Sequence, residues 1–528
     1  MAKIEKIIIV GGGTSGWLTA TYLAKHLGFE HPHSTKITLI ESSEIPTVGV
    51  GEATILPIRP LIESLGIDEA RFMKESSATF KLAIKFADWL YLPEDSKKHG
   101  KRPWYYHAFG RYSQVGPDIL APYWMLNGEA EKQSFVDYSM IEGKICDGMR
   151  GPKRIEDQEY RGPVEYAYHF DAGRLSTLLK TMGSELGVEH LIGTVKKVVL
   201  DSDGAIKSLE TVEHGTLKAD LYIDCTGFAG HLIEKAMGGK FHSFNHMLFN
   251  DAAIACQVPY SDPKCPLPPY TTSTAQENGW TWDIPLNDRR GVGYVYSSQY
   301  TDADRAEELL RGYLGKDGDD LSYLRIKMRV GSRREQWFKN CVSIGLSAGF
   351  VEPLESTGIY LVDIAVRRLV EFLPVVEQMP LAAARFNQGM NQTFEDIVDF
   401  IKLHFVLSKR TDTDFWIDNR KEDTMPASLL QKLEFWKYRV PAPLEFTDFS
   451  AIFGLTSYVQ IMYGMDHLPD LSGQEDRFLY AEAARKKSER LDVIAQDGLR
   501  VLPDERVLID EIYQTGFRAN KTATRMNS

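Results

Sequence analysis

The sequence predicts an α/β protein with a two-part Rossmann-like fold, an inserted β-sheet and a mainly helical C-terminal layer. A β-branched run at residues 6–10 leads through a Gly-rich turn into a helical pattern. A later run at 219–227 again ends in glycine, which indicates a parallel sheet that is interrupted and then completed. From Ile359 to about Tyr438 apolar residues recur at helical spacing, broken near Pro374 and Thr411.

The Gly-rich turn reads Gly11-Gly12-Gly13-Thr14-Ser15-Gly16 and lies between a predicted strand and a predicted helix. Glycines allow the backbone to approach a pyrophosphate, which rests on the helix N-terminus. A second predicted strand, residues 36–40, is followed by Glu41, about 25 positions after Gly16 and near the usual offset for an acid that bonds a ribose hydroxyl. The turn alone could be a tight loop and Glu41 alone a solvated acid, but together they predict dinucleotide binding.

The composition excludes several classes of function. The chain has 528 residues and a net charge of −12, which does not favour nucleic-acid binding. Its five cysteines are scattered without a CxxC pair, so we expect reduced thiols in a cytoplasmic protein and no metal site. Glycines interrupt the apolar run at the N-terminus, which predicts neither a membrane span nor a signal peptide.

The stretch from Gly345 to Gly358 combines a Gly-rich approach, a proline between two carboxylates and a Ser-Thr-Gly step. Because a helix is predicted to follow it, Thr357 and Gly358 fall in the first helical turn. Backbone N–H groups there lack internal partners and the helix dipole favours an anion. This stretch therefore predicts an anion site beside an acid, Glu355.

Residues 78–86 alternate as a strand does, with Lys81 on the face opposite Phe80 and Leu82. A lysine in a strand is usually a solvated edge residue. Residues 104–109 are rich in aromatic side chains, which is typical of a lid over an aromatic ligand and equally of a small satellite core.

Three further elements are predicted. Asp171 is a candidate N-cap for a helix that starts near Arg174, and residues 190–200 and 209–212 are expected to form a hairpin. Residues 279–286 place Trp280 and Trp282 on one side of a strand that Pro285 ends, with residues 293–297 as its antiparallel partner. Aromatic pairs in strands are usually core residues.

Assembled in order, these residues resemble the flavin-dependent tryptophan halogenase family over essentially the full length of the chain. Three motifs carry the resemblance: the Gly11 to Gly16 turn, Trp280-x-Trp282-x-Ile284-Pro285, and Glu355-Ser356-Thr357-Gly358. Many flavoproteins share the first motif, whereas the double-Trp motif is specific to these halogenases.

The resemblance implies that FAD, as FADH2 supplied by diffusion from a separate flavin reductase, reacts with O2 and a halide ion, chloride or bromide. The product, hypohalous acid, then passes along a tunnel to the substrate. Lys81 would hold or activate this oxidant, Glu355 would take the proton from the aromatic ring or help to polarise the oxidant, and Trp280 and Trp282 would form the barrier between flavin and substrate.

The resemblance also implies the remaining site residues. Gly49, Gly51 and Ala53 match the strap over the flavin, Thr357 and Gly358 would bind the halide, and the substrate would lie against His107, Phe109 and Glu355. The expected cofactor-binding residues are Gly11, Gly13, Thr14, Ser15, Gly16, Glu41, Ala53, Val195, Leu346 and Ile359.

The chain departs from the family where free tryptophan is held by its amino-acid end. Residues 449–458 carry few charged groups and no adjacent Tyr pair, and Tyr458 stands where the family often has Trp. The expected substrate is therefore a small electron-rich aromatic: tryptophan, indole or a relative. The alternatives are an FAD-dependent aromatic monooxygenase and a flavin carrier that has lost its chemistry.

We expect a halogenase core at 1–360, with dinucleotide-binding parts around 1–80, 185–235 and 340–360, and a helical region that covers the substrate at 361–528. The expected partners are the small aromatic substrate and the flavin reductase, without nucleic acid or membrane, and a homodimer is left open.

Overall fold

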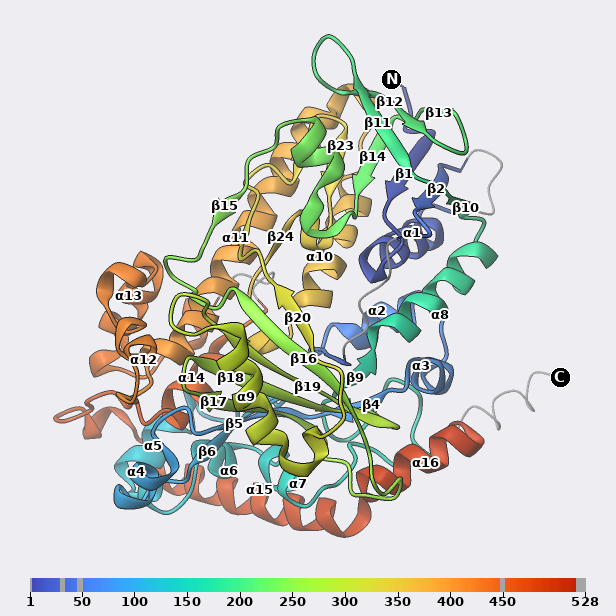
Figure 1. Cartoon of the computed structure of the whole chain (residues 1–528). Helices are drawn as coiled ribbons and strands as arrows, with labels where there is room; N and C mark the ends of the chain where they lie inside the picture. The colour runs from blue at the N-terminus through green and yellow to red at the C-terminus, as the bar shows by residue number, and fades with distance from the viewer. Residues whose placement is uncertain (1, 29–33, 45–50, 447–451, 519–528) are drawn as a thin grey trace. The chain divides into compact units, whose positions relative to one another are not determined.

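A computed structural model describes residues 2–28, 34–44, 51–446 and 452–518 (Figure 1). The chain forms two compact units, and each unit is built from three segments. Unit 1 comprises Met1–Ser77, Phe170–Asn245 and Met328–Glu395, and unit 2 comprises Ala78–His169, His246–Lys327 and Asp396–Ser528. Among the described residues, no helix is both long and apolar enough to span a bilayer.

Unit 1 is organised around a six-stranded sheet in the order β10-β2-β1-β14-β23-β22. All neighbouring pairs are parallel except β22 and β23. Ile7, Ile8 and Ile9 in the centre of the sheet are fully buried, as expected for a parallel strand covered on both faces. The strand bounds are β1 Lys6–Val10, β2 Lys36–Glu41, β10 Glu189–Ile192, β14 Leu221–Asp224, β22 Trp337–Phe338 and β23 Cys341–Ser343.

Helices and small sheets complete unit 1. Helix α1 packs against both α8 and α10, and β11, β12 and β13 form an antiparallel sheet of their own. The helix bounds are α1 Thr14–His26, α2 Ile58–Ser64, α3 Glu69–Ser76, α8 Ala172–Glu185 and α10 Gly358–Glu371, and α11 Met379–Val406 begins in this unit and ends in unit 2. The remaining strands are β3 Gly51–Ala53, β11 Val195–Leu200, β12 Ile206–Thr211, β13 Thr216–Leu217, β15 His242–Ser243, β21 Gly331–Ser332 and β24 Gly349–Phe350.

Unit 2 is organised around a seven-stranded sheet in the order β20-β16-β19-β18-β17-β5-β6. Its pairs are antiparallel except for β17 and β5. The strand bounds are β5 Ala83–Ala87, β6 Trp104–Ala108, β16 Ala252–Pro259, β17 Tyr270–Gln276, β18 Gly279–Pro285, β19 Arg289–Tyr296 and β20 Leu324–Lys327. A separate strand, β4 Thr79–Lys81, pairs antiparallel with the start of β9 Ala167–Asp171.

Helix α9, Ala303–Leu314, packs on strands β16 and β19 of this sheet (Figure 1). Leu310 and Leu314 join Ile254, Val292 and Tyr294 in one buried apolar cluster. The other elements of unit 2 are α4 Pro93–Lys98, β7 Gln114–Val115, β8 Asp118–Ile119, α5 Ala121–Leu126, α6 Phe135–Ser139, α7 Glu142–Asp147, α12 Asp414–Asp418, α13 Ala427–Phe435, α14 Leu455–Gly464, α15 Ala481–Val501 and α16 Glu505–Thr515.

Several predicted elements are confirmed. The first two strands and the strand before residue 227 form the parallel sheet, and β18 pairs with β19 as expected. Asp171 is the N-cap of α8, because its side chain accepts a hydrogen bond from the Arg174 N–H at 2.9 Å. The region after Ile359 is largely helical, with breaks between α10 and α11 and between α11 and α12.

Three local predictions are wrong or replaced by another structure. Residues 78–86 form two strands in different sheets instead of one continuous strand. The break is at Leu82, whose N–H donates to the Pro269 carbonyl at 2.8 Å. Residues 190–200 are split in the same way: β10 joins the parallel sheet, and only β11 forms the hairpin with β12. Residues 104–108 are a strand at the edge of the sheet, not a lid.

Candidate active site

The Gly-rich turn of unit 1 has the geometry that a bound pyrophosphate needs. Gly11 has φ +112°, and a Cβ there would lie 2.3 Å from the Cys225 carbonyl oxygen. A Cβ at Gly16 would lie 1.9 Å from the Gly11 carbonyl oxygen. Gly13 is the N-cap of α1, and none of the described side chains caps it or lies within 4 Å of a Cβ placed there. The first N–H groups of α1 are therefore open to an anion.

Glu41 ends β2 beside this turn, where its spacing in the sequence places it. Its carboxylate accepts hydrogen bonds from His190 Nε2 at 2.7 Å and from Lys180 Nζ at 3.3 Å. It also lies so close to Gly12 that a Cβ at that position would be 1.7 Å from Oε2. His190 and Lys180 are about 150 positions away along the chain, so no local pattern could have pointed to them.

The other predicted cofactor residues of this region lie in different settings. Ala53 is buried at the end of β3, whereas Gly49 is outside the described residues. Val195 begins β11 and packs against the apolar cluster that includes Val10 and Ile40. Burial raises the pKa of Glu52, directly before Ala53 on β3, to about 7, and the nearby charge of Asp171 is the second cause. No sequence motif points to Glu52, because its protonation depends on the folded surroundings.

The turn at Gly345–Ser347 lies against the Gly-rich turn. A Cβ at Gly345, which has φ +74°, would be 2.3 Å from Ser15 Oγ and 3.8 Å from the Val362 side chain of α10. Leu346 at the tip of this turn is 39% exposed, which is unusual for a leucine beside buried strands and suits contact with an apolar ring. Ser347 anchors the turn through a hydrogen bond to the Asp224 carbonyl.

The predicted halide end follows in the same unit. Pro353–Glu355 form a 3₁₀ turn, Ser356 adopts a left-handed conformation with φ +60°, and Thr357 is the N-cap of α10. The first turn of α10 contains no acidic residue, and none of the described side chains caps it. Gly358 is exposed, and no described atom lies within 4 Å of a Cβ built on it. Glu355 is fully buried and Ile359 is half-buried.

In unit 2, Lys81 is fully buried rather than a solvated edge residue. Its Nζ lies 5.1 Å from the centroid of the Phe109 ring. The two residues meet because β5 pairs with β6 and because the Phe109 N–H donates to the Leu82 carbonyl at 2.8 Å. The structure thus brings a predicted catalytic residue together with a predicted substrate residue.

His107, one strand position away from Ala108, belongs to an aromatic cluster. Its ring centroid lies 5.5 Å from that of Phe400 and 6.3 Å from that of Phe453, and these two phenyl rings stack at 4.0 Å. The ring centroids of Tyr458 and Phe400 are 5.1 Å apart, and the Tyr458 hydroxyl lies 3.3 Å from Lys432 Nζ.

Gln460 of α14 holds the backbone between His107 and Phe109. Its Oε1 accepts from the Ala108 N–H at 2.7 Å, and its Nε2 donates to the Ala108 carbonyl at 3.2 Å. The side chain is 1% exposed. Sequence reasoning missed Gln460, because a glutamine 352 positions from its partner carries no motif.

Trp280 and Trp282 lie on one face of β18 with ring centroids 6.3 Å apart. Gly293 on β19 makes room for Trp282, since a Cβ there would lie 2.2 Å from the indole. The Trp282 Nε1 is buried and has no hydrogen-bond partner within the described ranges. Both rings are therefore buried, and Trp282 has an unused hydrogen-bond donor.

Two buried carboxyl groups of unit 2 lie beside the backbone next to Phe109 and next to Lys81, respectively. Burial raises the pKa of Glu142 to about 7, and its Oε2 would be 2.7 Å from a Cβ at Gly110, directly after Phe109. Burial also raises the pKa of Glu505 to about 8. Glu505 Oε1 accepts from the Phe80 N–H at 2.9 Å, and the Tyr513 hydroxyl donates to the Ala78 carbonyl at 3.2 Å. Helix α16 thus holds the strand of Lys81 through two hydrogen bonds.

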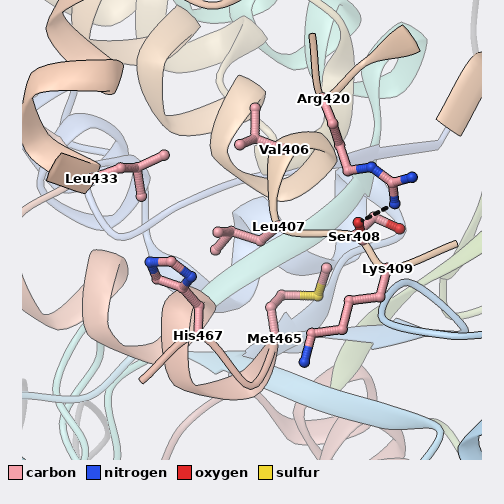
Figure 2. A pocket seen from close by; sticks show the side chains of 8 residues that line it. All are labelled: Val406, Leu407, Ser408, Lys409, Arg420, Leu433, Met465 and His467. Atoms are coloured by element: carbon pink, nitrogen blue, oxygen red, sulfur yellow. Dashed lines mark hydrogen bonds between the residues drawn. The ribbon is translucent and has the colours of Figure 1, made fainter. Parts of the chain in front are cut away.

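Unit 2 also contains a cavity of about 400 Å³. Figure 2 shows the side chains that line it: Val406, Leu407, Ser408, Lys409, Arg420, Leu433, Met465 and His467. None of the predicted site residues is among them. Its two permanent cations are engaged, Arg420 with the Ser408 carbonyl at 2.8 Å and Lys409 with Asp466 at 3.0 Å.

Comparison with known proteins decides the family. The family model described as tryptophan halogenase matches residues 6–478. The chain belongs to the tryptophan halogenase family. Tryptophan 6-halogenase SttH from Streptomyces toxytricini is 38% identical over 458 residues, which cover 83% of this chain and 84% of the relative. Tryptophan 7-halogenase RebH from Lentzea aerocolonigenes is 40% identical over 446 residues, 82% of each chain.

The solved structure of a tryptophan halogenase from Shewanella frigidimarina matches this halogenase with a TM-score of 0.92 at 35% identity, over 98% of this chain and 99% of that chain. The predicted family and the predicted Rossmann-like fold are therefore confirmed, and the enzyme is a flavin-dependent halogenase. The uncapped turn at Gly13 and the acid-free start of α1 fit a flavin dinucleotide. Among the described residues, no group of His, Cys, Asp or Glu could hold a metal ion.

Proposed function

We propose that this halogenase uses FADH2, O2 and a halide to halogenate tryptophan, indole or a related electron-rich aromatic, with Lys81 as the residue that holds the oxidant. One observation carries the assignment of Lys81: a fully buried lysine whose ammonium faces the ring of Phe109. A buried ammonium is a strong hydrogen-bond donor in its low-dielectric surroundings, which suits it to hold a polar oxidant beside an aromatic substrate.

The bound flavin supplies hypohalous acid when it is reduced and meets O2 and halide. We propose that Gly11, Gly13, Thr14, Ser15 and Gly16 bind its pyrophosphate through their backbone, with Glu41 at the ribose. The contact between Gly345 and Ser15 supports a position of Leu346 beside the flavin ring. The free first turn of α10 supports Thr357 and Gly358 as the halide site. The roles of Ala53, Val195 and Ile359 stay predictions.

At the substrate, the Lys81 ammonium would donate a hydrogen bond to the hypohalous oxygen and make the halogen more electrophilic. The ring carbon then forms a bond to the halogen while the halogen–oxygen bond breaks and both electrons stay on oxygen. The leaving hydroxide takes a proton from the Lys81 ammonium and departs as water, and the ring proton goes to a base, for which we propose Glu355. Return of that proton to Lys81 through solvent restores both residues. His107 and Phe109 would hold the substrate ring in one orientation. Trp280 and Trp282 would form a barrier that separates the substrate from the flavin.

The relatives support tryptophan as the first substrate to try, because SttH and RebH are tryptophan halogenases by name. The aromatic cluster of His107, Phe400 and Phe453 supports the indole ring as the part that is recognised. A separate flavin reductase is part of the proposal. The cytoplasmic location and a homodimer stay predictions.

The test is to incubate the protein with FAD, a flavin reductase, NADH and either chloride or bromide, and to offer tryptophan, indole and indole carboxylic acids in parallel. We expect a halogenated product that requires reductase, O2 and halide together. Hydroxylated products alone would instead identify a monooxygenase. If stopped-flow measurements show that NADPH reduces the bound FAD without the reductase, the two-component arrangement is contradicted.

A further inference from the structure

Beside Lys81, three buried side chains and one carbonyl form a continuous hydrogen-bonded chain. His169 Nε2 lies 2.9 Å from Thr271 Oγ1, and His169 Nδ1 lies 3.1 Å from Thr79 Oγ1. Thr79 Oγ1 in turn lies 2.6 Å from the Pro285 carbonyl oxygen. Thr79 and His169 are 0% exposed and Thr271 is 5% exposed. We call Thr271, His169, Thr79 and the Pro285 carbonyl the His169 chain.

The carbonyl at its end fixes the direction of every proton in the His169 chain. A carbonyl only accepts, so the single hydroxyl proton of Thr79 goes to Pro285. Thr79 Oγ1 must then accept from His169 Nδ1–H. A neutral imidazole has one N–H, so Nε2 accepts the hydroxyl proton of Thr271. All of these hydrogen bonds are made with the imidazole neutral, whereas a second ring proton would require Thr271 Oγ1 to accept rather than donate.

The surroundings favour the same state. Burial lowers the pKa of His169 well below its usual value, and the nearby positive charge of Lys81 lowers it further. The imidazole therefore stays neutral beside a cationic lysine. The His169 imidazole therefore links Thr79 and Thr271 by hydrogen bonds and does not act as an acid or a base.

The His169 chain joins four strands, and two of them, β4 and β18, carry predicted site residues. Thr79 is two residues before Lys81 on β4, so both side chains lie on one face of that strand. Pro285 is the last residue of β18, three residues after Trp282. Thr271 is on β17, which pairs with both β18 and β5. Thr79 and His169 are also directly opposite each other in the pairing of β4 with β9.

We propose that the His169 chain sets the position of Lys81 relative to the Trp280–Trp282 strand, and so decides whether hypohalous acid is delivered to the substrate or escapes. Thr79, His169 and Thr271 are positioning residues in this proposal, since their polar atoms bond one another and Pro285. The proposal rests on the function proposed above. Its chemical reason is that delivery of a small diffusible oxidant depends on geometry at the scale of one ångström.

The test uses a pair of substitutions that differ in the hydroxyl. Thr79→Val keeps the shape of the side chain but removes the donor to Pro285 and the acceptor for His169 Nδ1–H, whereas Thr79→Ser keeps the hydroxyl. The full-length enzyme is assayed with FAD, reductase, NADH, bromide and tryptophan, or the best substrate of the panel. Three quantities are measured: O2 consumed, halogenated aromatic formed, and hypohalous acid captured by a diffusible 1,3-diketone trap.

For Thr79→Val we expect FAD affinity and O2 consumption close to wild type. The halogenated aromatic formed per O2 consumed should fall about tenfold, with a matching gain in trapped hypohalous acid. Thr79→Ser should retain most of the product yield of the wild type. A purely structural role would lower FAD binding, O2 consumption and product together and would not redirect the oxidant to the trap.

Two results would overturn the proposal: an unchanged product yield in Thr79→Val, or an equal loss in Thr79→Ser, which keeps the hydroxyl and would show that the hydroxyl does not carry the effect. If Thr79→Val does not fold, Thr271→Val and Thr271→Ser pose the same question at the other end of the chain, with the same expected and contradicting results. A wild-type enzyme that forms no halogenated aromatic with any substrate would instead reject the proposed function.

Discussion

The ammonium nitrogen of Lys81 lies 5.1 Å from the centre of the Phe109 ring, and no part of the lysine side chain is exposed to solvent. The strand pairing of β5 with β6 and the hydrogen bond from Phe109 to Leu82 fix this relationship. An aromatic substrate beside Phe109 would therefore be near the only polar group that Lys81 contributes, which makes the lysine the first residue to change.

Lys81→Met should abolish halogenation while FAD binding stays within about twofold of wild type. Methionine fills the buried volume but has no charge and no donor, and removal of a group of this kind costs on the order of 10²-fold or more in rate. Lys85→Met is the matched control, because Lys85 is a half-buried lysine of β5 whose Nζ lies over the Trp104 ring at 4.2 Å. Loss of FAD affinity in Lys81→Met, measured by fluorescence titration, would contradict a role at the substrate.

Glu355→Gln should slow halogenation strongly without changing the free energy of unfolding by more than about 1 kcal/mol. Glutamine has nearly the same shape as the buried carboxylate but cannot take the ring proton. The rate of product formation at saturating substrate is the quantity to measure. A kcat equal to that of the wild type would remove Glu355 from the proton transfer.

Gly358→Ala should raise the halide concentration needed for half-maximal rate. A Cβ at this exposed position meets no described atom within 4 Å, so the protein should fold with at least its original stability. The added methyl would occupy space at the first turn of α10, where the halide is proposed to bind. Thermal melting serves as the control, and a bromide dependence like that of the wild type would place the halide elsewhere.

Gln460→Met should weaken substrate binding and lower stability together. It leaves the buried N–H and carbonyl of Ala108 without their partner, at a cost of about 1–3 kcal/mol. We expect a higher KM for the aromatic substrate, because the backbone between His107 and Phe109 loses its anchor, and an unchanged affinity for FAD. Ser457→Ala on the same helix, at a half-buried position, is the control. Equal effects of both substitutions would show general damage to α14.

Glu505→Gln should change how stability depends on pH. Burial raises the pKa of Glu505 to about 8 in the folded protein, against about 4.3 in an unfolded chain. Between these values the folded state keeps a proton that the unfolded state has lost, so the stability of the wild type falls as pH rises from about 5 to 8. Glutamine cannot ionise, so the variant should gain relative stability across this range by on the order of a few kcal/mol. Urea unfolding at pH 5 and pH 8 measures the difference, and parallel curves for both proteins would refute it.

Local patterns predicted the parts of the fold whose causes are local. The β-branched run before Gly11, the N-cap at Asp171 and the alternation around Trp280 each depend on neighbouring residues. The break at Leu82 could not be predicted in this way, because its cause is a hydrogen bond to Pro269, far along the chain. The split of residues 190–200 has the same origin: β10 is recruited by β2.

The same distinction between local and distant causes applies to the candidate site. Family motifs drew attention to Lys81, Phe109 and the glycines of the turn. They gave no reason to select His169, Gln460 or Glu505, whose partners lie about 90 to 425 positions away. The burial of Lys81 was equally out of reach, since a strand with alternating residues does not reveal whether a second layer covers its polar face.

The hydrogen bond from Phe80 to Glu505 also has a consequence for the order of synthesis. Its two residues are 425 positions apart, so at roughly 5–20 residues per second a ribosome needs on the order of half a minute to make the second after the first. Until then the strand that carries Lys81 lacks one of its anchors. An incompletely synthesised or C-terminally shortened enzyme should consequently lose more hypohalous acid to solvent than the full-length enzyme. Affinity tags are better placed where they leave α16 able to form its hydrogen bonds with the strand of Lys81.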